Sequence, residues 1–583
     1  MSAMSRSVPH GASEVAATPM LRDPLRRGEY LKPFLRAVPR LLASVDRNPF
    51  GPSYGCCDRQ YWHYRTAAFP SEMYQEAALP LALAYVRRLP GNRWYGEPRL
   101  AEAATAAIRF SARTAHADGS ADDYYPQERA LGAVVFSLQA QTEAYRLLRS
   151  DDADLLRFFH RRAWWIAEHG ESGRLTNHHA LAALALWRTA DLTGDEGLRR
   201  AALAKVDDVV ASQHGEGWFP EYGGADPGYQ TVTIDCLAKL RRLADLPRLD
   251  EPLRRATAFA RWFQHPDGGY GGEYGSRGTR HFHAHGFELA AAVDADAADL
   301  ADGFLRSLAG DTAAELADDR MYAHRLAGLV EAYEDWTPRR PPSRTRPTSQ
   351  WFAGAGLFVH RDARCHVIVS TARGGTLHVH RVDGAAPPLV DAGLVVETAT
   401  GHVGVSQTHD LKRPATIDWF GDDAPSPAER PGERRDVAAI TVVDSLRRVR
   451  FERATPFKQA LLHLGMTLLG RFGRTAARTF LQRRTIAAGR TLPLRHARKI
   501  HLVRRHDIGP VVAVEIVDEL ELLDAALRVR RLSFAADLQA AYTAAAETYQ
   551  HSILQPWHDL AEHVDALNTR RRTVVRRTIE VGS

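Results

Sequence analysis

The chain has 583 residues, of which 45% are hydrophobic and 25% charged, a composition that indicates a globular protein and excludes a disordered or fibrous one. At roughly 100–200 residues per domain, two to four domains are expected. The net charge of +6 favours an acidic partner, but the chain has no block of five or more basic residues, so no nucleic-acid partner is predicted.

The N-terminal residues and the cysteines bear on location. Residues 1–25 are expected to form a disordered tail, and they lack the apolar segment of a secretory signal peptide. The chain has no stretch of about eighteen apolar residues, so no membrane-spanning helix is predicted. The four cysteines show no C-x-x-C spacing and are expected to be reduced thiols. Together these features predict a cytoplasmic protein.

Residues 26–340 predict one helix after another. Ala, Leu and Arg dominate, and apolar residues recur at helical spacing. Four segments share one layout, at intervals of roughly fifty residues: a Gly-bearing turn, then a polar cluster, then an apolar helical run. The repeated unit is interpreted as a helical hairpin. Hairpins that close into a ring place equivalent helix starts on one rim, so the sequence predicts an (α/α) toroid with its site on that rim.

The four polar clusters supply the predicted site residues. The candidate catalytic residues are Asn177, His178, Tyr229, His281 and His283. The candidate substrate-binding residues are Tyr125, Glu128, Glu221, Tyr222, Arg277 and Arg280. A histidine pair with alternate spacing, such as His281 and His283, also suits a metal, but no acidic or cysteine ligand lies at a suitable spacing, so a cationic, proton-donating cleft is favoured.

The composition changes at residues 341–350, where Pro and Arg are frequent and a linker is expected. Residues 351–583 follow with short, alternating, β-branched runs that predict an antiparallel β-sandwich. The fold class is therefore α+β multidomain. One segment, 455–484, departs from this pattern and predicts an inserted amphipathic, basic helix. Its apolar side is expected to pack on the sandwich; the alternative is a peripheral contact of residues 457–484 with the inner face of a membrane.

The rim residues suit the chemistry of uronic acids. Breaking a 4-linked uronide by β-elimination requires that the C6 carboxylate be neutralised, which Asn, His and Arg donors achieve through hydrogen bonds placed where negative charge develops. A base must remove the C5 proton, and His or ionised Tyr serves. An acid must protonate the O4 leaving group, a role for a Tyr hydroxyl. An acidic, uronate-containing polysaccharide is therefore the predicted substrate.

Three alternatives remain open at this point. A glycoside hydrolase on the same toroid needs two carboxylates beside the bond, and the rim offers Glu128, Glu221, Asp226 and Glu288. A uronate C5 epimerase shares the proton abstraction and differs only in the following step. A non-catalytic polysaccharide-binding or assembly protein would keep the cleft without needing Tyr229. The sequence does not determine the oligomeric state.

The succession of Asn177-His178, Tyr229 about fifty residues later, and a His-rich segment before a β domain resembles the heparinase II/III-like polysaccharide lyases, including toroidal alginate lyases. The resemblance implies that Asn177 and His178 neutralise the uronate carboxylate. It also implies that Tyr229 is the acid, or both acid and base, with help from His281 or His283.

The same resemblance bears on cofactors. Members of this family often carry a His/Asp cluster at the start of the β domain, which in some holds a structural zinc. The segment GGTLHVHRVDGAAPPLVDAG resembles that cluster, so the ligands that it implies are His378, His380 and Asp391, with Asp383 and His409 nearby in sequence. One of these histidines could instead reach the toroid rim. The prediction is therefore that no cofactor is bound, and a structural zinc at these residues is the alternative.

Overall fold

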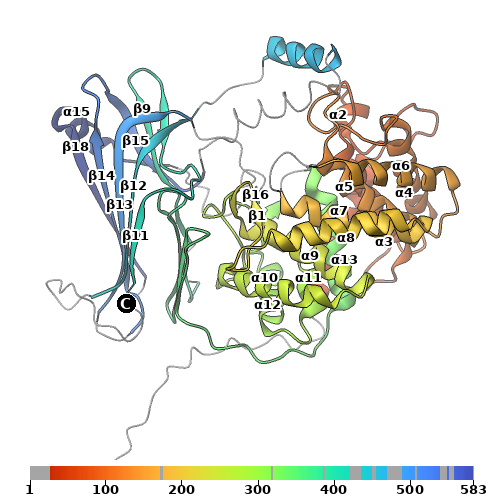
Figure 1. Cartoon of the computed structure of the whole chain (residues 1–583), viewed down its shortest axis with the longest axis horizontal. Helices are drawn as coiled ribbons and strands as arrows, with labels where there is room; N and C mark the ends of the chain where they lie inside the picture. Colours follow the sequence, from red (N-terminus) through yellow and green to blue (C-terminus); the bar gives the residue numbers. More distant parts are fainter. Residues whose placement is uncertain are drawn as a thin grey trace, which may run out of the picture.

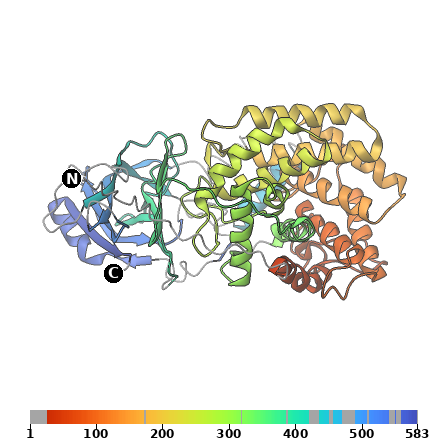
Figure 2. The same cartoon turned by 90° about the horizontal axis from the view of Figure 1, so that it is seen from below.

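The computed structural model describes residues 26–170, 175–316, 319–384, 388–419, 435–449, 455–468, 489–505, 509–538, 548–549 and 557–581. These residues form a helical part and a β part, which lie side by side along the long axis of the molecule (Figures 1 and 2). The α+β architecture predicted from the sequence is confirmed. The predicted disordered tail, residues 1–25, lies outside the described residues.

An inner ring of helices forms the centre of the helical part. It comprises α3 (Ala78–Val86), α5 (Leu131–Leu147), α7 (Thr176–Thr193), α9 (Pro227–Leu243), α11 (His285–Ala290) and α13 (Asp319–Asp335). Each helix packs on the next, and α13 packs back on α3, so the ring closes. In α5, 14 of 17 residues are buried, because both sides of an inner helix face protein.

Outer helices cover the ring. They are α1 (Leu31–Ser44), α4 (Pro98–Thr114), α6 (Ala153–Glu168), α8 (Glu196–Ala211), α10 (Asp250–Ala260) and α12 (Ala295–Ala309), and a short α2 (Arg59–Trp62) precedes α3. In α8 only 4 of 16 residues are buried, as expected of a helix with one side in water. Helices α6, α8 and α9 begin at Asp152, Asp195 and Asp226, whose carboxylates accept backbone N–H bonds of the first turn. The predicted toroid of helical hairpins is thus confirmed.

Two antiparallel sheets form the β part. The smaller runs in chain order through β4 (Ser349–Phe352), β5 (Leu357–Arg361), β6 (Cys365–Ser370), β7 (Thr376–Arg381) and β8 (Leu389–Asp391). The larger has the order β17-β15-β9-β10-β12-β13-β14-β18, with β11 paired to β12. Its strands are β9 (Gly393–Thr398), β10 (Val403–Val405), β11 (Ala415–Trp419), β12 (Arg435–Val449), β13 (Thr491–Arg504), β14 (Ala513–Leu522), β15 (Val529–Ala535), β17 (Trp557–Asp559) and β18 (Arg572–Glu580).

A shared apolar core joins the two sheets. Phe358 and Val367 of the smaller sheet belong to the same buried cluster as Ile440, Ile500 and Ile516 of the larger one. Burying alternate residues of both sheets between them is what defines a sandwich. A short helix, α15 (Val564–Arg570), packs on β15 and β18 of the larger sheet.

The chain between the two parts lies along the toroid. Helix α13 ends at Asp335 and β4 begins at Ser349, so the predicted linker 341–350 runs into the first strand. Within this stretch Arg340 forms a buried ion pair with Glu288 at 2.8 Å, and Arg346 pairs with Asp296 of α12. The linker is therefore held against the toroid by ion pairs.

The inserted helix is shorter in the described residues than predicted, and its expected packing was wrong. It covers residues 456–468, and the rest of the predicted segment, 469–484, lies outside the described residues. Met466 is buried, whereas Phe457, Leu461 and Leu464 are 57–77% exposed, so the apolar side does not pack on the sandwich. No helix among the described residues is both long enough and apolar enough to cross a membrane.

Candidate functional site

The start of α7 and a small hairpin position the first pair of site residues. The hairpin consists of β1 (Pro220–Glu221) and β2 (Gly224–Ala225). The backbone N–H and the side-chain Nδ2 of Asn177 each donate to one oxygen of the Glu221 carboxyl group, both at 2.8 Å. Thr176 adds a bond from its hydroxyl to the Pro220 carbonyl at 2.7 Å. These bonds fix the helix start against the next repeat, as the toroid geometry predicts.

Burial dominates the electrostatics of this pair. Asn177 and Glu221 are each 1% exposed. Burial raises the pKa of Glu221 to about 8, although the two bonds from Asn177 act to lower it. Glu221 is therefore a protonated, neutral carboxyl group at neutral pH. The side-chain oxygen Oδ1 of Asn177 is buried and has no hydrogen-bond partner among the described residues.

His178 follows Asn177 on the same helix turn. Its ring lies against Gly132 at the start of α5, where a Cβ atom would come within 2.8 Å of the imidazole. Phe136 of α5 packs on the same ring at 5.8 Å between centroids. Burial lowers the pKa of His178 to about 4, so its imidazole is neutral at physiological pH. Glycine at position 132 thus leaves the room that a neutral histidine occupies.

Asp226 joins the start of α9 to the His-rich segment. Its carboxylate accepts the N–H of Tyr229 at 3.1 Å, which caps the helix, and the N–H of Arg277 at 2.8 Å. The hydroxyl of Thr279 donates to it as well. The sequence Asp-Pro-Gly encodes this turn, since Asp is a favoured N-cap and Pro suits the first helical position. One buried carboxylate therefore holds two repeats together.

Tyr229 and Arg277 complete the group. The half-buried ring of Tyr229 lies 5.8 Å from the ring of His281, and the guanidinium of Arg277 lies 4.3 Å from the ring centre of Tyr222. Tyr222 has a φ of +53°, in the left-handed region that non-glycine residues rarely adopt. We refer to Asn177, His178, Glu221, Tyr222, Tyr229, Arg277 and His281 as the rim cluster.

Other predicted site residues lie in different surroundings. The ring of His283 packs at 5.2 Å on that of His324, whose Nδ1 is 3.2 Å from a carboxyl oxygen of Glu76 inside the ring. Arg280 forms a buried ion pair with Glu273.

Two further predicted substrate-binding residues, Tyr125 and Glu128, lie in the loop before α5. Glu128 accepts backbone N–H bonds from residues 123 and 124 of its own loop, at 3.3 and 2.7 Å, and thus orders that loop. Tyr125, also predicted to bind substrate, is only 6% exposed. Their roles in substrate binding stay predictions.

The β part reaches the rim, as predicted for one of its histidines. The ring of His409 lies so close to Gly224 of the β1–β2 hairpin that a Cβ atom there would be 2.4 Å away. Arg373 donates from Nε to the Gly275 carbonyl at 2.8 Å. Burial and the nearby charge of Arg277 lower the pKa of Arg373 to about 9. The cationic character of the site thus comes partly from the sandwich.

A histidine cluster lies deeper between the two parts. Ligand atoms of His265, His378 and His380 lie within 4.8 Å of one another, and all three side chains are buried. His366 packs on this group at 6.0 Å from the ring of His380. Burial lowers the pKa of all four histidines, so they are neutral and available as metal ligands. The predicted ligands His378 and His380 do come together, but with partners that the sequence did not indicate.

The third predicted ligand, Asp391, was wrong. Its carboxylate lies 3.1 Å from Arg498 and 2.6 Å from Arg577, inside the sandwich. Although burial alone would raise the pKa of Asp391, the two guanidinium groups lower it, which is the behaviour of an ion-paired structural carboxylate. Asp383 is exposed on the turn after β7. Strand β8 pairs directly with β7, but Asp391 lies opposite Leu377, whose side chain belongs to the sandwich core. Because side chains alternate along a strand, Asp391 is on the other face of the sheet from His378 and His380.

A second group with metal-ligating side chains is structural. His360, Asp362 and Cys365 lie close together, but both nitrogens of His360 are engaged, with Ser349 at 2.8 Å and with Asp362 at 3.0 Å. Burial raises the pKa of the Cys365 thiol, which disfavours the thiolate that metals bind.

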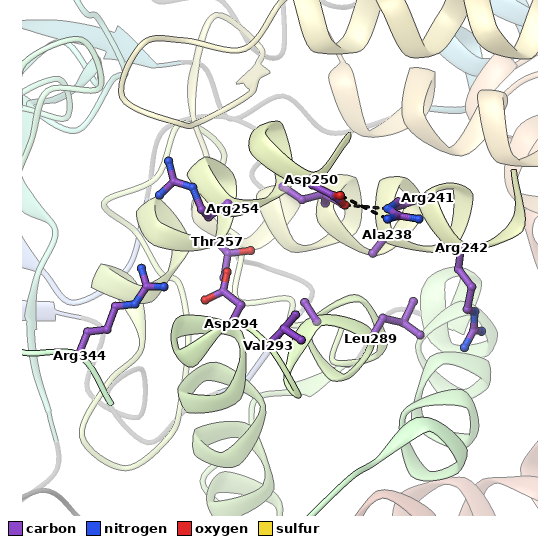
Figure 3. Close-up of a pocket in the computed structure, with 12 residues that line it drawn as sticks. Ala238, Arg241, Arg242, Asp250, Arg254, Thr257, Leu289, Val293, Asp294 and Arg344 are labelled. Atoms are coloured by element: carbon purple, nitrogen blue, oxygen red, sulfur yellow. Dashed lines mark hydrogen bonds and ion pairs between the residues drawn. The ribbon is translucent and has the colours of Figure 1, made fainter. Parts of the chain in front are cut away.

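One open pocket lies away from these groups, on the outside of the toroid. It has a volume of about 550 Å³ and lies between α9, α10 and the turn that follows α11 (Figure 3). Arg241 at its edge is held by Asp250 at 2.7 Å and by Asp245 at 3.2 Å, and Arg254 is paired with Glu251. Arg241 and Arg254 are therefore engaged by neighbouring carboxylates.

Some residues of these clusters have no clear signal in the sequence. Glu273, the partner of Arg280 and His378, lies in a Gly-rich loop, and His265 lies in a turn before it. His366 pairs directly across from His380 on adjacent strands, so only knowledge of the strand register would have placed it.

Comparison with known proteins gives matches at the level of structure. No protein-family model and no curated protein matches the chain. Among solved structures, a Paenibacillus xanthan lyase matches with 11% identity and a TM-score of 0.48, over 89% of this chain and 47% of the lyase. A Streptomyces coelicolor A3 chondroitin AC lyase in complex with chondroitin sulphate matches with 14% identity and a TM-score of 0.49, over 90% and 69%.

Heparinase III matches with 13% identity and a TM-score of 0.44, over 91% of this chain and 75% of that protein. These three similar structures are polysaccharide lyases, as the sequence resemblance predicted, and an unsaturated glucuronyl hydrolase also matches, with 13% identity over 55% of this chain. The chain spans about half the length of the xanthan lyase. Identities and TM-scores this low carry no argument about activity, so the function must be derived from the rim cluster.

Proposed function

We propose that this protein is a lyase that cleaves an acidic, uronate-containing polysaccharide by β-elimination. The observation that carries the proposal is the buried pair of Asn177 and a neutral Glu221, next to the neutral His178 and on the same rim as Tyr229 and His281. This group combines hydrogen-bond donors for a carboxylate with proton-transfer groups, and both are needed for the reaction.

The neutral Glu221 gives Asn177 a specific orientation. The two ends of an amide are distinguished only by their hydrogen bonds. With its proton on Oε2, Glu221 donates to the amide oxygen of Asn177, which reverses the amide orientation in which Nδ2 donates to Oε2, while Oε1 still accepts the backbone N–H. The Asn177 Nδ2 group then occupies the buried position that lacks a partner among the described residues, and its N–H groups are the donors that we assign to the substrate carboxylate. His178 adds a ring N–H, and Arg277 adds positive charge.

The proton transfers use Tyr229 and His281. His281 removes the C5 proton, the electron pair forms the C4–C5 double bond, and the C4–O4 bond breaks. Tyr229 gives its hydroxyl proton to O4, so one proton is taken and one is delivered. The ring contact with Tyr229 favours His281 over His283 for this role, because His283 packs on His324 inside the ring.

The alternative of a glycoside hydrolase is less well supported. Such an enzyme needs two carboxyl groups that flank the bond. Of the predicted candidates, Asp226 is occupied by backbone N–H groups, Glu128 is bound to its own loop and Glu288 is paired with Tyr30 and Arg340. Glu221 is left as a single acid. A C5 epimerase would use the same rim cluster and is separated from a lyase only by its product.

One assay separates these activities. The full chain is incubated with a panel of polyuronates and glycosaminoglycans, and ultraviolet absorbance of unsaturated uronate is recorded together with reducing ends. The proposal predicts that both rise together. Reducing ends without absorbance would mean hydrolysis, deuterium exchange at C5 without cleavage would mean epimerisation, and binding alone would mean a non-catalytic protein.

We also propose that the histidine cluster binds a divalent transition metal such as zinc. The fit rests on its hydrogen bonds: Nε2 of His378 lies 2.8 Å from a Glu273 oxygen, and Nε2 of His265 lies 3.2 Å from the Tyr274 hydroxyl. Such outer contacts orient histidine ligands. The buried Nδ1 of His378 and Nε2 of His380 have no hydrogen-bond partner among the described residues. Bound there, a metal would stabilise the contact between toroid and sandwich.

Metal analysis of the purified chain tests this assignment. About one zinc per chain is expected for a three-histidine site. His380→Ala should lose the metal, whereas His409→Ala, which removes a histidine outside the cluster, should retain it. Equal metal content in wild type and His380→Ala would contradict the assignment.

A further inference from the structure

The helix at 456–468 exposes an apolar stripe. Phe457, Leu461, Leu464 and Leu468 are 77, 60, 57 and 75% exposed. At about 100° per residue these four side chains fall within a sector of about 60°. The only buried side chain of the helix, Met466, lies on the opposite side. The stripe is therefore one continuous face of the helix and is fully presented to solvent.

The opposite face rests on the toroid. The ring of His463 packs edge-on against Phe69, at 6.3 Å between centroids, and Figure 1 shows the light-blue helix lying over the part of the toroid that contains α2. Thr455 begins the helix: its carbonyl accepts the N–H of Gln459 at 2.9 Å and its hydroxyl accepts that of Lys458 at 3.3 Å. Pro456 suits the first helical position. Local sequence and the toroid contact thus hold the helix with its apolar stripe facing outward.

The positive charge of the surrounding sequence indicates what the stripe binds. From residue 453 to residue 490 the chain has eight Lys and Arg residues and no Asp or Glu. Of these cations the helix itself carries Lys458, which is exposed, and six others lie outside the described residues. An apolar helix face in a strongly basic segment matches an anionic lipid surface: the apolar side chains enter the acyl region, and the net positive charge of the segment is attracted to the headgroups. A protein partner with an apolar groove would need no such excess of positive charge.

We propose that the stripe of helix 456–468 docks the protein on an anionic membrane surface. The helix lies in the interface and does not cross the bilayer, since its 13 described residues are fewer than the roughly 20 required to span it. The proposal is independent of the reaction assigned to the rim cluster.

Vesicle flotation with the full chain tests the proposal. The protein is expected to float with vesicles of phosphatidylglycerol and phosphatidylcholine, to float less at high salt, and to stay in solution with phosphatidylcholine alone. Phe457→Asp and Leu464→Asp should each reduce flotation by roughly tenfold or more. Phe50→Asp is the matched control, because Phe50 is 95% exposed but lies outside the stripe, and it should float like wild type.

Three results would reject membrane docking. Circular dichroism must first show that each variant is folded. Absence of flotation with anionic vesicles at low salt, or flotation unchanged by both stripe variants, would reject membrane docking. If sedimentation instead reveals a dimer that Leu464→Asp dissociates, the stripe joins two copies of the chain and the lipid proposal fails.

Discussion

Two buried polar sites of this protein differ in their charges. In the sandwich, Arg498 and Arg577 surround Asp391 and Asp518, a group that we call the sandwich cluster. At the toroid rim, Glu221 is buried without a cation in direct contact among the described residues. Both sites are almost completely buried. Burial alone would raise the pKa of Asp391 and Asp518, but the arginines lower it, and His496 also donates to Asp518 at 2.7 Å. At the rim, burial prevails, so Glu221 keeps its proton and His178 stays neutral.

This difference separates structural from functional polar groups. A buried ion pair with all its hydrogen bonds made has a fixed charge state and resists change. A carboxyl group with a raised pKa, such as Glu221, can gain or lose a proton near physiological pH, which is what acid–base chemistry requires. Removing a residue of the sandwich cluster should therefore affect folding, and removing one of the rim cluster should affect turnover.

The largest effect is expected for Tyr229→Phe. Loss of the acid that protonates O4 should lower kcat by roughly two to four orders of magnitude, with the thermal unfolding midpoint unchanged. Tyr95→Phe, at an exposed site, serves as the control for the loss of a hydroxyl group. Wild-type turnover by Tyr229→Phe would remove this residue from the mechanism.

Arg498→Met is expected to lower the stability of the β part. It leaves Asp391 and Asp518 buried with one guanidinium fewer, which should cost about 3–5 kcal/mol in the free energy of unfolding of the β part. Denaturant unfolding followed by a β-sheet signal measures it. Arg495→Met on the same strand removes a half-exposed arginine and should cost little. If both substitutions have the same small effect, the sandwich cluster does not stabilise the fold.

Asn177→Ala tests whether the Asn177 amide stabilises the transition state or only binds the substrate. If Nδ2 of Asn177 stabilises the enolate-like carboxylate, kcat should fall by roughly a hundredfold to a thousandfold, with a smaller change in KM. Asn92→Ala removes an amide that holds carbonyls of its own loop and should alter stability only. A change confined to KM would identify Asn177 as an ordinary binding residue.

The smallest effect concerns pH. Glu221 must be protonated to donate to Asn177, so kcat/KM of the wild type should decline above about pH 8. Glu221→Gln keeps a donor that does not titrate, and this alkaline decline should move to higher pH, whereas Glu221→Ala should be slower at every pH. An unchanged alkaline limb in Glu221→Gln would show that Glu221 does not titrate in the reaction.

The same carboxyl group links stability to pH with a defined sign. Its folded-state pKa of about 8 exceeds the ordinary value of 4.5, so the folded state holds a proton that the unfolded state releases between these values. Glu221 therefore makes the protein less stable as the pH rises from about 4.5 to about 8. In Glu221→Gln this contribution should be absent from the pH dependence of unfolding.

The architecture and much of the rim cluster could be predicted from the sequence. Helical periodicity and the repeat of Gly-bearing turns specify hairpins, and closing hairpins into a ring brings Asn177 beside the repeat that contains Glu221. The Asp-Pro-Gly turn before Tyr229 is also a local signal, and the structure has Asp226 as the N-cap of α9. These features depend on short stretches of chain, so the sequence determines them directly.

The tertiary structure alone decided which groups are paired and which are charged. Asp391 follows the HxH motif in sequence but meets Arg498 and Arg577, and His265 and His366 join His378 from distant segments. The apolar side of helix 456–468, expected against the sandwich, faces solvent. Long-range strand register determines which groups are paired, and local periodicity does not predict it. Burial determines which groups are charged, because the desolvation that shifts a pKa is produced by the whole surrounding fold.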